Sequence, residues 1–236
     1  MEERYLRTCA LIGEENLNKL KNSTVAVFGI GGVGSFALEA LVRSGVGRIF
    51  IYDSDKVSKS NINRQLVAYD STVLQSKVQV AKQRCRDINP DAEIAAFDLF
   101  ISDKTPLPFE EFDFIVDAVD NVTAKLYLIE SAKEKNIPII SVMGTGNKLY
   151  PELLEIGDVF DTSGCPLCRI MRSELKKRGI KALDVIWSKE TPIKPKTQID
   201  GDTSGKPAVA SMAFVPGSAG LLAASFVVRS LCSQKL

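Results

Sequence analysis

Short apolar runs rich in β-branched residues alternate along this chain with longer segments of helical character. Each run is too brief for a helix and is bounded by turn-forming residues, so it predicts a buried strand. The predicted strands are residues 24–28, 48–52, 93–98, 113–117 and 138–142. Helices are expected between them, over residues 33–44 and from about Ser71 to Asn89. This alternation predicts an α/β fold with a doubly wound, mostly parallel sheet.

The C-terminal part of the chain is expected to extend this sheet with a helix, one or two strands and a closing helix. We find no internal repeat and no low-complexity linker, so we expect a single domain over residues 1–236. Residues 1–150 form its nucleotide-binding half and residues 151–236 its substrate-facing extension. The uncharged stretch 207–228 is long enough to suggest a membrane span, but Pro216-Gly217 interrupts it. We expect a strand and a core helix there, and no membrane segment.

A glycine-rich turn follows the first predicted strand. Its glycines are Gly29, Gly31, Gly32 and Gly34. Glycines at such a turn let backbone N–H groups and the positive end of the following helix approach an anion. The next strand ends at Asp53, nineteen residues past Gly34, where Rossmann-like folds place an acid on ribose hydroxyls. The sequence therefore predicts a nucleotide site.

Polar residues after Asp53 favour a nucleoside triphosphate over NAD. Asn61, Asn63, Arg64 and Gln65 place four hydrogen-bonding side chains within five positions. Lys77 follows, near the start of the predicted helix. A solvated loop and a solvated helix lysine are the simpler interpretations of these residues. Their proximity to the phosphate-binding turn favours contacts with a triphosphate.

Carboxylates end the strand predicted at 113–117. Asp117 and Asp120 lie at the carboxyl end of the sheet, where open α/β sheets bind ligands. Hard oxygen ligands suit Mg²⁺, so Asp120 is a candidate to hold that ion on the phosphates. A helix cap for the segment after Asn121 is an alternative role that does not exclude the first.

As a set, these motifs resemble the adenylation domain of the ThiF-type superfamily, which activates ubiquitin and molybdopterin synthase and forms the thiamine thiocarboxylate. The resemblance implies an ATP site in which Asp53 binds the ribose. It implies phosphate contacts from Asn61, Arg64 and Lys77, and a catalytic role for Arg64, Lys77 and the Mg²⁺-binding Asp120. Further ATP-site residues carried over are Asp55, Gln65, Asn121 and, from the partner subunit of a homodimer, Arg7.

Further segments are similar to one branch of this superfamily, the tRNA threonylcarbamoyladenosine dehydratases. They are residues 4–20, 142–148, 165–169, 187–192 and 214–220. In that branch ATP activates the threonylcarbamoyl carboxylate beside the anticodon, and ring closure releases AMP. The alternative is an adenylyltransferase for the C-terminal carboxylate of a ubiquitin-like sulfur carrier, and cysteine desulfurase or sulfur-acceptor proteins are candidate partners. A non-catalytic NAD-binding or tRNA-binding module would not need Arg64, Lys77 and Asp120 together.

The chain contains no histidine, which excludes Ser-His and Cys-His nucleophilic systems and any histidine-bearing zinc site. Adenylation needs none, because an ionised carboxylate is already a nucleophile. Cys165 and Cys168 have zinc-ligand spacing, but this is one pair where a closed site needs four ligands. We therefore expect no zinc, with Pro166 in the first turn of a helix that continues over 169–178. Five cysteines without an apolar N-terminal stretch favour a reducing, cytoplasmic setting.

A local excess of positive charge indicates a nucleic-acid partner. The net charge is only +1, yet residues 165–198 hold nine Lys and Arg against three acids. Phosphate contacts dominate nucleic-acid affinity, so this segment suits a tRNA arm, although a solvated helix face is the plainer interpretation. The loop 196–206 is expected to order on tRNA. The candidate tRNA-binding residues are Arg169, Arg172, Lys176, Lys177 and Arg178.

Overall fold

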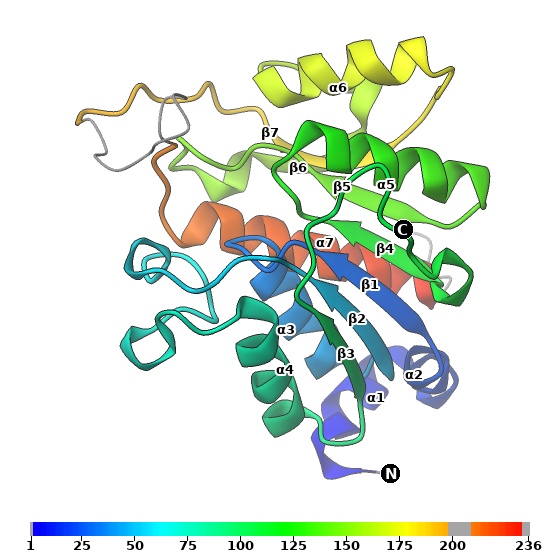
Figure 1. The fold of residues 1–236 in the computed structure, drawn as a ribbon. Coiled ribbons are helices and arrows are strands. Elements are labelled where there is room, and N and C mark those ends of the chain that lie inside the picture. Colours follow the sequence, from blue (N-terminus) through cyan, green and yellow to red (C-terminus); the bar gives the residue numbers. More distant parts are fainter. Residues whose placement is uncertain (1, 198–208, 233–236) are drawn as a thin grey trace.

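The computed structural model describes residues 2–197 and 209–232, and it contains one seven-stranded sheet (Figure 1). The strands are β1 (Thr24–Phe28), β2 (Arg48–Tyr52), β3 (Glu93–Phe97), β4 (Phe114–Asp117), β5 (Ile139–Val142), β6 (Leu154–Asp158) and β7 (Asp184–Ser188). Their spatial order is β3-β2-β1-β4-β5-β7-β6, and every neighbouring pair is parallel except β6 with β7. The five strands predicted from apolar runs are confirmed to within one residue at each end.

Helices cover both faces of the sheet. The α-helices are α1 (Leu6–Ile12), α2 (Glu14–Lys21), α3 (Gly34–Ser44), α4 (Lys77–Ile88), α5 (Val122–Glu134), α6 (Pro166–Lys177) and α7 (Phe214–Leu231). Short 3-10 helices are η1 (Glu3–Tyr5), η2 (Lys59–Asn61), η3 (Asp70–Thr72), η4 (Phe109–Glu111), η5 (Pro151–Leu153) and η6 (Val159–Asp161). Alternate residues of β1 face opposite cores: Val25 and Val27 pack with α3, α4 and α7, whereas Ala26 and Phe28 pack with α5 and α6.

The helix predicted from about Ser71 begins instead at Lys77, so that boundary was wrong. Residues 74–76 pair with residues 56–57: the Leu74 N–H donates to the Val57 carbonyl, and the Val57 N–H donates to the Gln75 carbonyl. Leu74 also has a φ of 71°, which a helix cannot contain. The pairing places Lys77 at the first position of α4, where its backbone N–H donates to the Asp55 carbonyl.

The closing helix is confirmed, but the strand expected before it is absent from the described residues 209–213. Pro216 does not interrupt the apolar stretch, because it occupies the third position of α7, where a missing N–H costs no helical hydrogen bond. Among the described helices, α7 alone is long and apolar enough to cross a membrane. Its buried face packs on α3, however, with Gly220 against the backbone of Val33 and Ala37.

We predict that Gly220→Ala destabilises the protein. A Cβ at this position would overlap the Val33 carbonyl oxygen and lie 2.9 Å from the Ala37 nitrogen, so α3 and α7 would have to separate. We expect a loss of about 2 kcal/mol in urea or thermal unfolding, more than the ~1 kcal/mol that alanine gains in helix propensity. Ser225→Ala, at an exposed position of the same helix, is the control and should change stability by less than about 0.5 kcal/mol. Equal stability of Gly220→Ala and the wild type would contradict this packing.

Candidate active site

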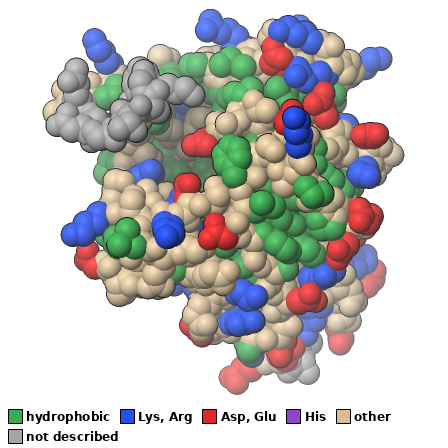
Figure 2. Space-filling model, viewed as in Figure 1, with side chains coloured by type: hydrophobic (Ala, Val, Ile, Leu, Met, Phe, Trp, Pro, Cys, Tyr) green, Lys and Arg blue, Asp and Glu red, His purple; other side chains and the backbone are tan. Residues whose placement is uncertain are grey.

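A cavity of about 480 Å³ opens at the carboxyl ends of β1, β2, β4 and β5. Figure 2 shows the molecular surface hollowed on this face, with acidic side chains at the rim. One wall is formed by residues after β5 and before α7, including Gly144, Gly146 and Ser211. The opposite wall and floor contain ten predicted site residues, which are Gly29, Gly31, Gly32, Asp53, Asp55, Asn61, Arg64, Gln65, Lys77 and Asp120.

The glycine turn brings α3 against the end of β1. Gly29 has a φ of 86°, and a Cβ there would lie 2.7 Å from the Ala118 carbonyl oxygen. A Cβ on Gly34 would overlap the carbonyl oxygen of Gly29, so only glycine permits this approach. Gly34 does not line the cavity, unlike Gly29, Gly31 and Gly32. The sequence therefore located the turn, but its last glycine serves packing.

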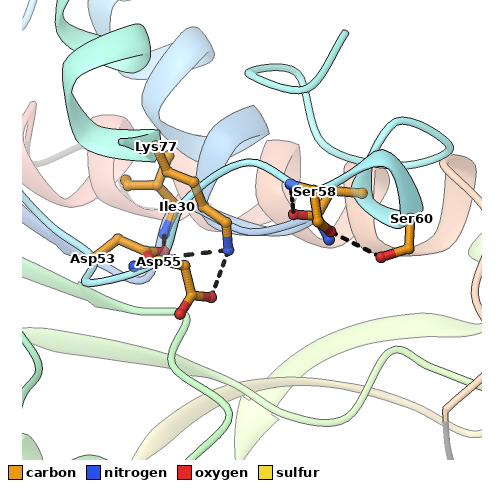
Figure 3. A network of polar contacts seen from close by, with 7 residues as sticks. Ile30, Asp53, Asp55, Ser58, Ser60 and Lys77 are labelled. Atoms are coloured by element: carbon orange, nitrogen blue, oxygen red, sulfur yellow. Dashed lines mark hydrogen bonds and ion pairs between the residues drawn. The ribbon is translucent and has the colours of Figure 1, made fainter. Parts of the chain in front are cut away.

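A lysine between two carboxylates lies beside this turn (Figure 3). The Asp53 carboxylate accepts the Ile30 N–H at 2.7 Å and the Asp55 N–H at 2.8 Å. The Lys77 Nζ lies 2.7 Å from Asp55 Oδ2 and 3.9 Å from Asp53 Oδ1, and only 5% of its side chain is exposed. Burial raises the pKa of the Asp53 carboxyl, and the Lys77 charge opposes that rise. A phosphate at Lys77 would therefore compete with Asp55 for the ammonium.

The polar segment after Asp53 forms a second part of the wall. Asn61 ends η2 and its Oδ1 accepts the Ser58 N–H at 3.2 Å. The Arg64 guanidinium donates to the Ser60 carbonyl at 2.8 Å and to Asn63 Oδ1 at 2.9 Å, which holds it beside the cavity. Gln65 is only 7% exposed, and its buried Oε1 has no hydrogen-bond partner among the residues that the structure describes. A buried acceptor without a donor costs free energy, so a ligand hydroxyl or amine is expected to satisfy it.

Asp120 and Asn121, neighbours in sequence, have different positions. Asp120 is exposed on the cavity wall, whereas Asn121 does not line the cavity. The Asn121 Oδ1 accepts the Ala124 N–H at 3.1 Å, so the helix cap considered for Asp120 belongs to Asn121. Mg²⁺ is commonly held by one or two carboxylates together with phosphates and water, which suits Asp120. The described residues contain no cluster of three or more metal-binding side chains.

The apolar part of the cavity was not identified from the sequence. Leu99 and Phe100, after β3, and Val119, after β4, line it and offer a wall for a base. Phe100 is 61% exposed and Leu99 is 38% exposed, so both offer apolar surface at the cavity. Arg7 lies on α1, is exposed, and does not line the cavity of its own chain.

The loop after β5 is held by residues that the sequence analysis did not name as site residues. The Glu190 carboxylate accepts the N–H groups of Leu149 and Tyr150 at 2.9 to 3.0 Å. Asn147 exchanges two hydrogen bonds with Ala210, through its backbone N–H and its Oδ1. These bonds fix the wall opposite Asp53. No local pattern indicates them, because each joins residues forty or more positions apart.

Most of the basic side chains proposed for tRNA are already paired. Arg172 donates to the Thr162 carbonyl at 2.9 Å. Arg178 pairs with Glu130 at 3.0 Å and with Glu174 at 2.6 Å, and Glu174 also binds Lys177 at 2.6 Å. The remaining two are Arg169, which is exposed, and Lys176, which lies over the Phe160 ring. The segment 198–206 of the predicted tRNA loop lies outside the described residues.

The two cysteines of the spaced pair begin α6. Cys165 is the residue before the helix, and Pro166 occupies its first turn as predicted. Both thiols are buried. A hydrogen bond from Cys168, helped by backbone N–H groups and the Lys148 charge, lowers the pKa of the Cys165 thiol.

Comparison with known proteins identifies the family to which this chain belongs. The sequence pattern of the ThiF family matches residues 3–235. The chain belongs to the ThiF family. It is 43% identical to the tRNA threonylcarbamoyladenosine dehydratase of Bacillus subtilis, over 98% of this chain and 95% of that protein.

Two solved structures of the Escherichia coli tRNA threonylcarbamoyladenosine dehydratase match this ThiF-family chain over 98% of its length and 95% of theirs. The complex with AMP has a TM-score of 0.90 at 29% identity. The complex with ATP has a TM-score of 0.88 at 28% identity. The doubly wound fold expected from the sequence is confirmed by these matches.

We predict that Gln65→Leu separates stability from nucleotide affinity. Replacing a buried acceptor that has no partner within residues 2–197 and 209–232 by an apolar group of similar size should leave the melting temperature unchanged or raise it. The same change should weaken ATP binding by roughly tenfold, the size of one lost hydrogen bond to a polar ligand. Calorimetric titration with ATP and a thermal melt measure the two effects. Unchanged ATP affinity would show that Gln65 does not contact the nucleotide.

Proposed function

We propose that this ThiF-family chain is an ATP-dependent tRNA threonylcarbamoyladenosine dehydratase. The observation that carries the proposal is the convergence of Arg64, Lys77 and Asp120 on one cavity, beside a glycine turn and a buried ribose-type acid. A dinucleotide needs the turn and the acid only. Two cations and an exposed carboxylate on the same wall suit the cleavage of a triphosphate. The near end-to-end similarity to named dehydratases supports the choice of substrate.

In this proposal Asp53 binds the ribose and Arg64 and Lys77 bind the phosphates. The threonylcarbamoyl carboxylate attacks the α-phosphorus, an acyl-adenylate forms, and pyrophosphate leaves with the charge that the two cations neutralise. The ureido group of the same nucleotide then attacks the acyl carbon, so a ring closes and AMP leaves. Mg²⁺ held by Asp120 would supply further charge neutralisation on the phosphates. Coupling this bond formation to ATP cleavage makes the reaction ligase-type.

The proposal includes a homodimer in the cytoplasm, where tRNA is found. Arg7 is exposed on α1 and lies outside its own cavity, which suits an arginine that reaches the phosphates of the partner subunit. Residues 1–236 act as one domain, since β6 and β7 continue the sheet that carries the nucleotide site. Cysteine desulfurase or sulfur-acceptor proteins stay candidate partners.

The decisive experiment supplies the purified protein with ATP and tRNA with or without the threonylcarbamoyl modification. We expect AMP release only with the modified tRNA, together with a cyclic nucleoside in digested tRNA measured by mass spectrometry. AMP release that instead requires a ubiquitin-like sulfur carrier would favour the alternative adenylyltransferase. Binding of tRNA without any AMP release would identify a non-catalytic module.

We predict that Lys77→Ala and Asp120→Ala each lower the rate of AMP release by ~100-fold or more while the protein stays folded. The expected size is that of one lost charge contact to the reacting phosphates. Lys82→Ala, on the same helix as Lys77, and Asp103→Ala, an exposed acid, lie outside the cavity and serve as controls. Nearly wild-type rates in both cavity variants, checked for folding by circular dichroism, would remove the adenylation proposal.

We predict that the exposed cations of α6 contribute tRNA affinity without contributing ATP affinity. Arg169→Gln combined with Lys176→Gln should weaken tRNA binding and flatten its dependence on salt by roughly two units of slope. Arg172 is left intact because it binds the Thr162 carbonyl. Lys19→Gln combined with Arg43→Gln removes the same charge from α2 and α3 and is the control. An unchanged slope in the α6 variant would mean that this face is only solvated.

A further inference from the structure

A fully buried ion pair lies beneath the candidate active site. The Lys125 Nζ, from α5, is 3.0 Å from Oδ2 of Asp117, the last residue of β4, and neither side chain is exposed. The same ammonium donates to Ser141 Oγ at 3.2 Å and to the Val142 carbonyl at 2.8 Å, both on β5. Ser141 Oγ in turn donates to Asp117 Oδ2 at 2.5 Å. The three N–H groups of Lys125 are thereby all engaged, and the network joins α5, β4 and β5.

Stability alone does not account for this network. Removing two charges from water is so costly that a buried ion pair is often no better for stability than well-packed apolar residues of similar volume. The neighbouring buried positions of α5 are apolar, including Ala124, Leu128, Ile129 and Ala132. An apolar side chain at position 125 would continue that core. The presence of the polar network must therefore be explained by its position in the fold.

Its position is at the base of two loops that line the cavity. Asp117 Oδ1 accepts the Val119 N–H at 3.2 Å, which fixes the turn that leads to Asp120. On the other side, the Val142 carbonyl that Lys125 holds begins the cavity-lining loop 142–146. One ammonium thus holds the first residues of both loops. Lys125 itself does not line the cavity and so cannot contact a ligand there.

We propose that Lys125 is a positioning residue for the adenylation step, which, with Asp117 and Ser141, sets the separation between Asp120 and the loop 142–146 across the cavity. The inference rests on the proposed function above. The Ile30 N–H and the Asp53 carboxylate follow β1 and β2, and they bond to each other and not to Lys125, Asp117 or Ser141. Loss of the network should therefore affect the reaction of bound substrates far more than the binding of ATP.

The test compares a variant that leaves one buried charge without its partner with a variant that removes both charges. Lys125→Met alone leaves the Asp117 carboxylate buried without its cation, and should lower the melting temperature by roughly 10 °C. Lys125→Met with Asp117→Asn removes both charges, and the new amide still offers an oxygen to the Val119 N–H. We expect this double variant to melt within about 4 °C of the wild type. Its kcat for AMP release should stay at least ~10-fold low while its Kd for ATP changes by less than about threefold.

The control neutralises a partly exposed ion pair that lies away from the cavity. Arg84 and Glu39 form an ion pair of 2.7 Å between α4 and α3, and neither lines the cavity, so Glu39→Gln with Arg84→Met should leave kcat unchanged. Recovery of kcat together with melting temperature in the Lys125–Asp117 double variant would overturn the proposal and leave the network a purely structural role. A double variant whose ATP affinity falls by the same factor as its kcat would also overturn the proposal. If the wild-type protein releases no AMP, the proposed function is contradicted instead. The ATP affinities of the wild type and the variants can still be compared in that case.

Discussion

The close approach of α3 to the end of β1 is the constraint on which the rest of the site depends. Gly34 lies against the carbonyl of Gly29, and Gly29 lies against the backbone after β4. Any side chain at these positions would push the helix away from the sheet. With the helix seated, the Ile30 N–H reaches Asp53, and the carboxyl ends of β1, β2 and β4 form one concave surface. This single contact places the N-terminal end of α3 beside Asp53.

Charge compensation is the second constraint, because several ionised groups lie in or under the cavity. Lys77 is almost buried and is compensated by Asp53 and Asp55, of which Asp55 is largely exposed and free to exchange with solvent. Lys125 is wholly buried and is compensated by Asp117 within a closed network. The first arrangement can yield its cation to a phosphate at modest cost, whereas the second cannot. This contrast separates a group suited to contact substrate from one suited to hold the scaffold.

In the basic segment 165–198, ion pairing reduces the positive charge that is available to a binding partner. Nine cations against three acids suggest a strongly positive surface. In the folded chain Glu130, far away in sequence, reaches Arg178, and Glu174 binds two of the cations. Arg172 is bound to the Thr162 carbonyl and supports the turn before α6. The positive field available to a nucleic acid is therefore weaker than composition implies, and Arg169 and Lys176 carry more of it than their neighbours do.

The sequence by itself determined the five strands β1 to β5, the glycine turn and the acid after β2. These features depend on local periodicity and on backbone conformations that only glycine allows. It could not determine that α4 begins at Lys77, since the pairing of residues 74–76 with 56–57 overrides the local helical pattern. Nor could it distinguish Asn121, which caps α5, from Asp120, which faces the cavity. Lys125 shares the apolar face of α5 with Leu128 and Ile129. Only the tertiary structure identifies its partners Asp117 and Ser141, because separate strands of the sheet bring them to it.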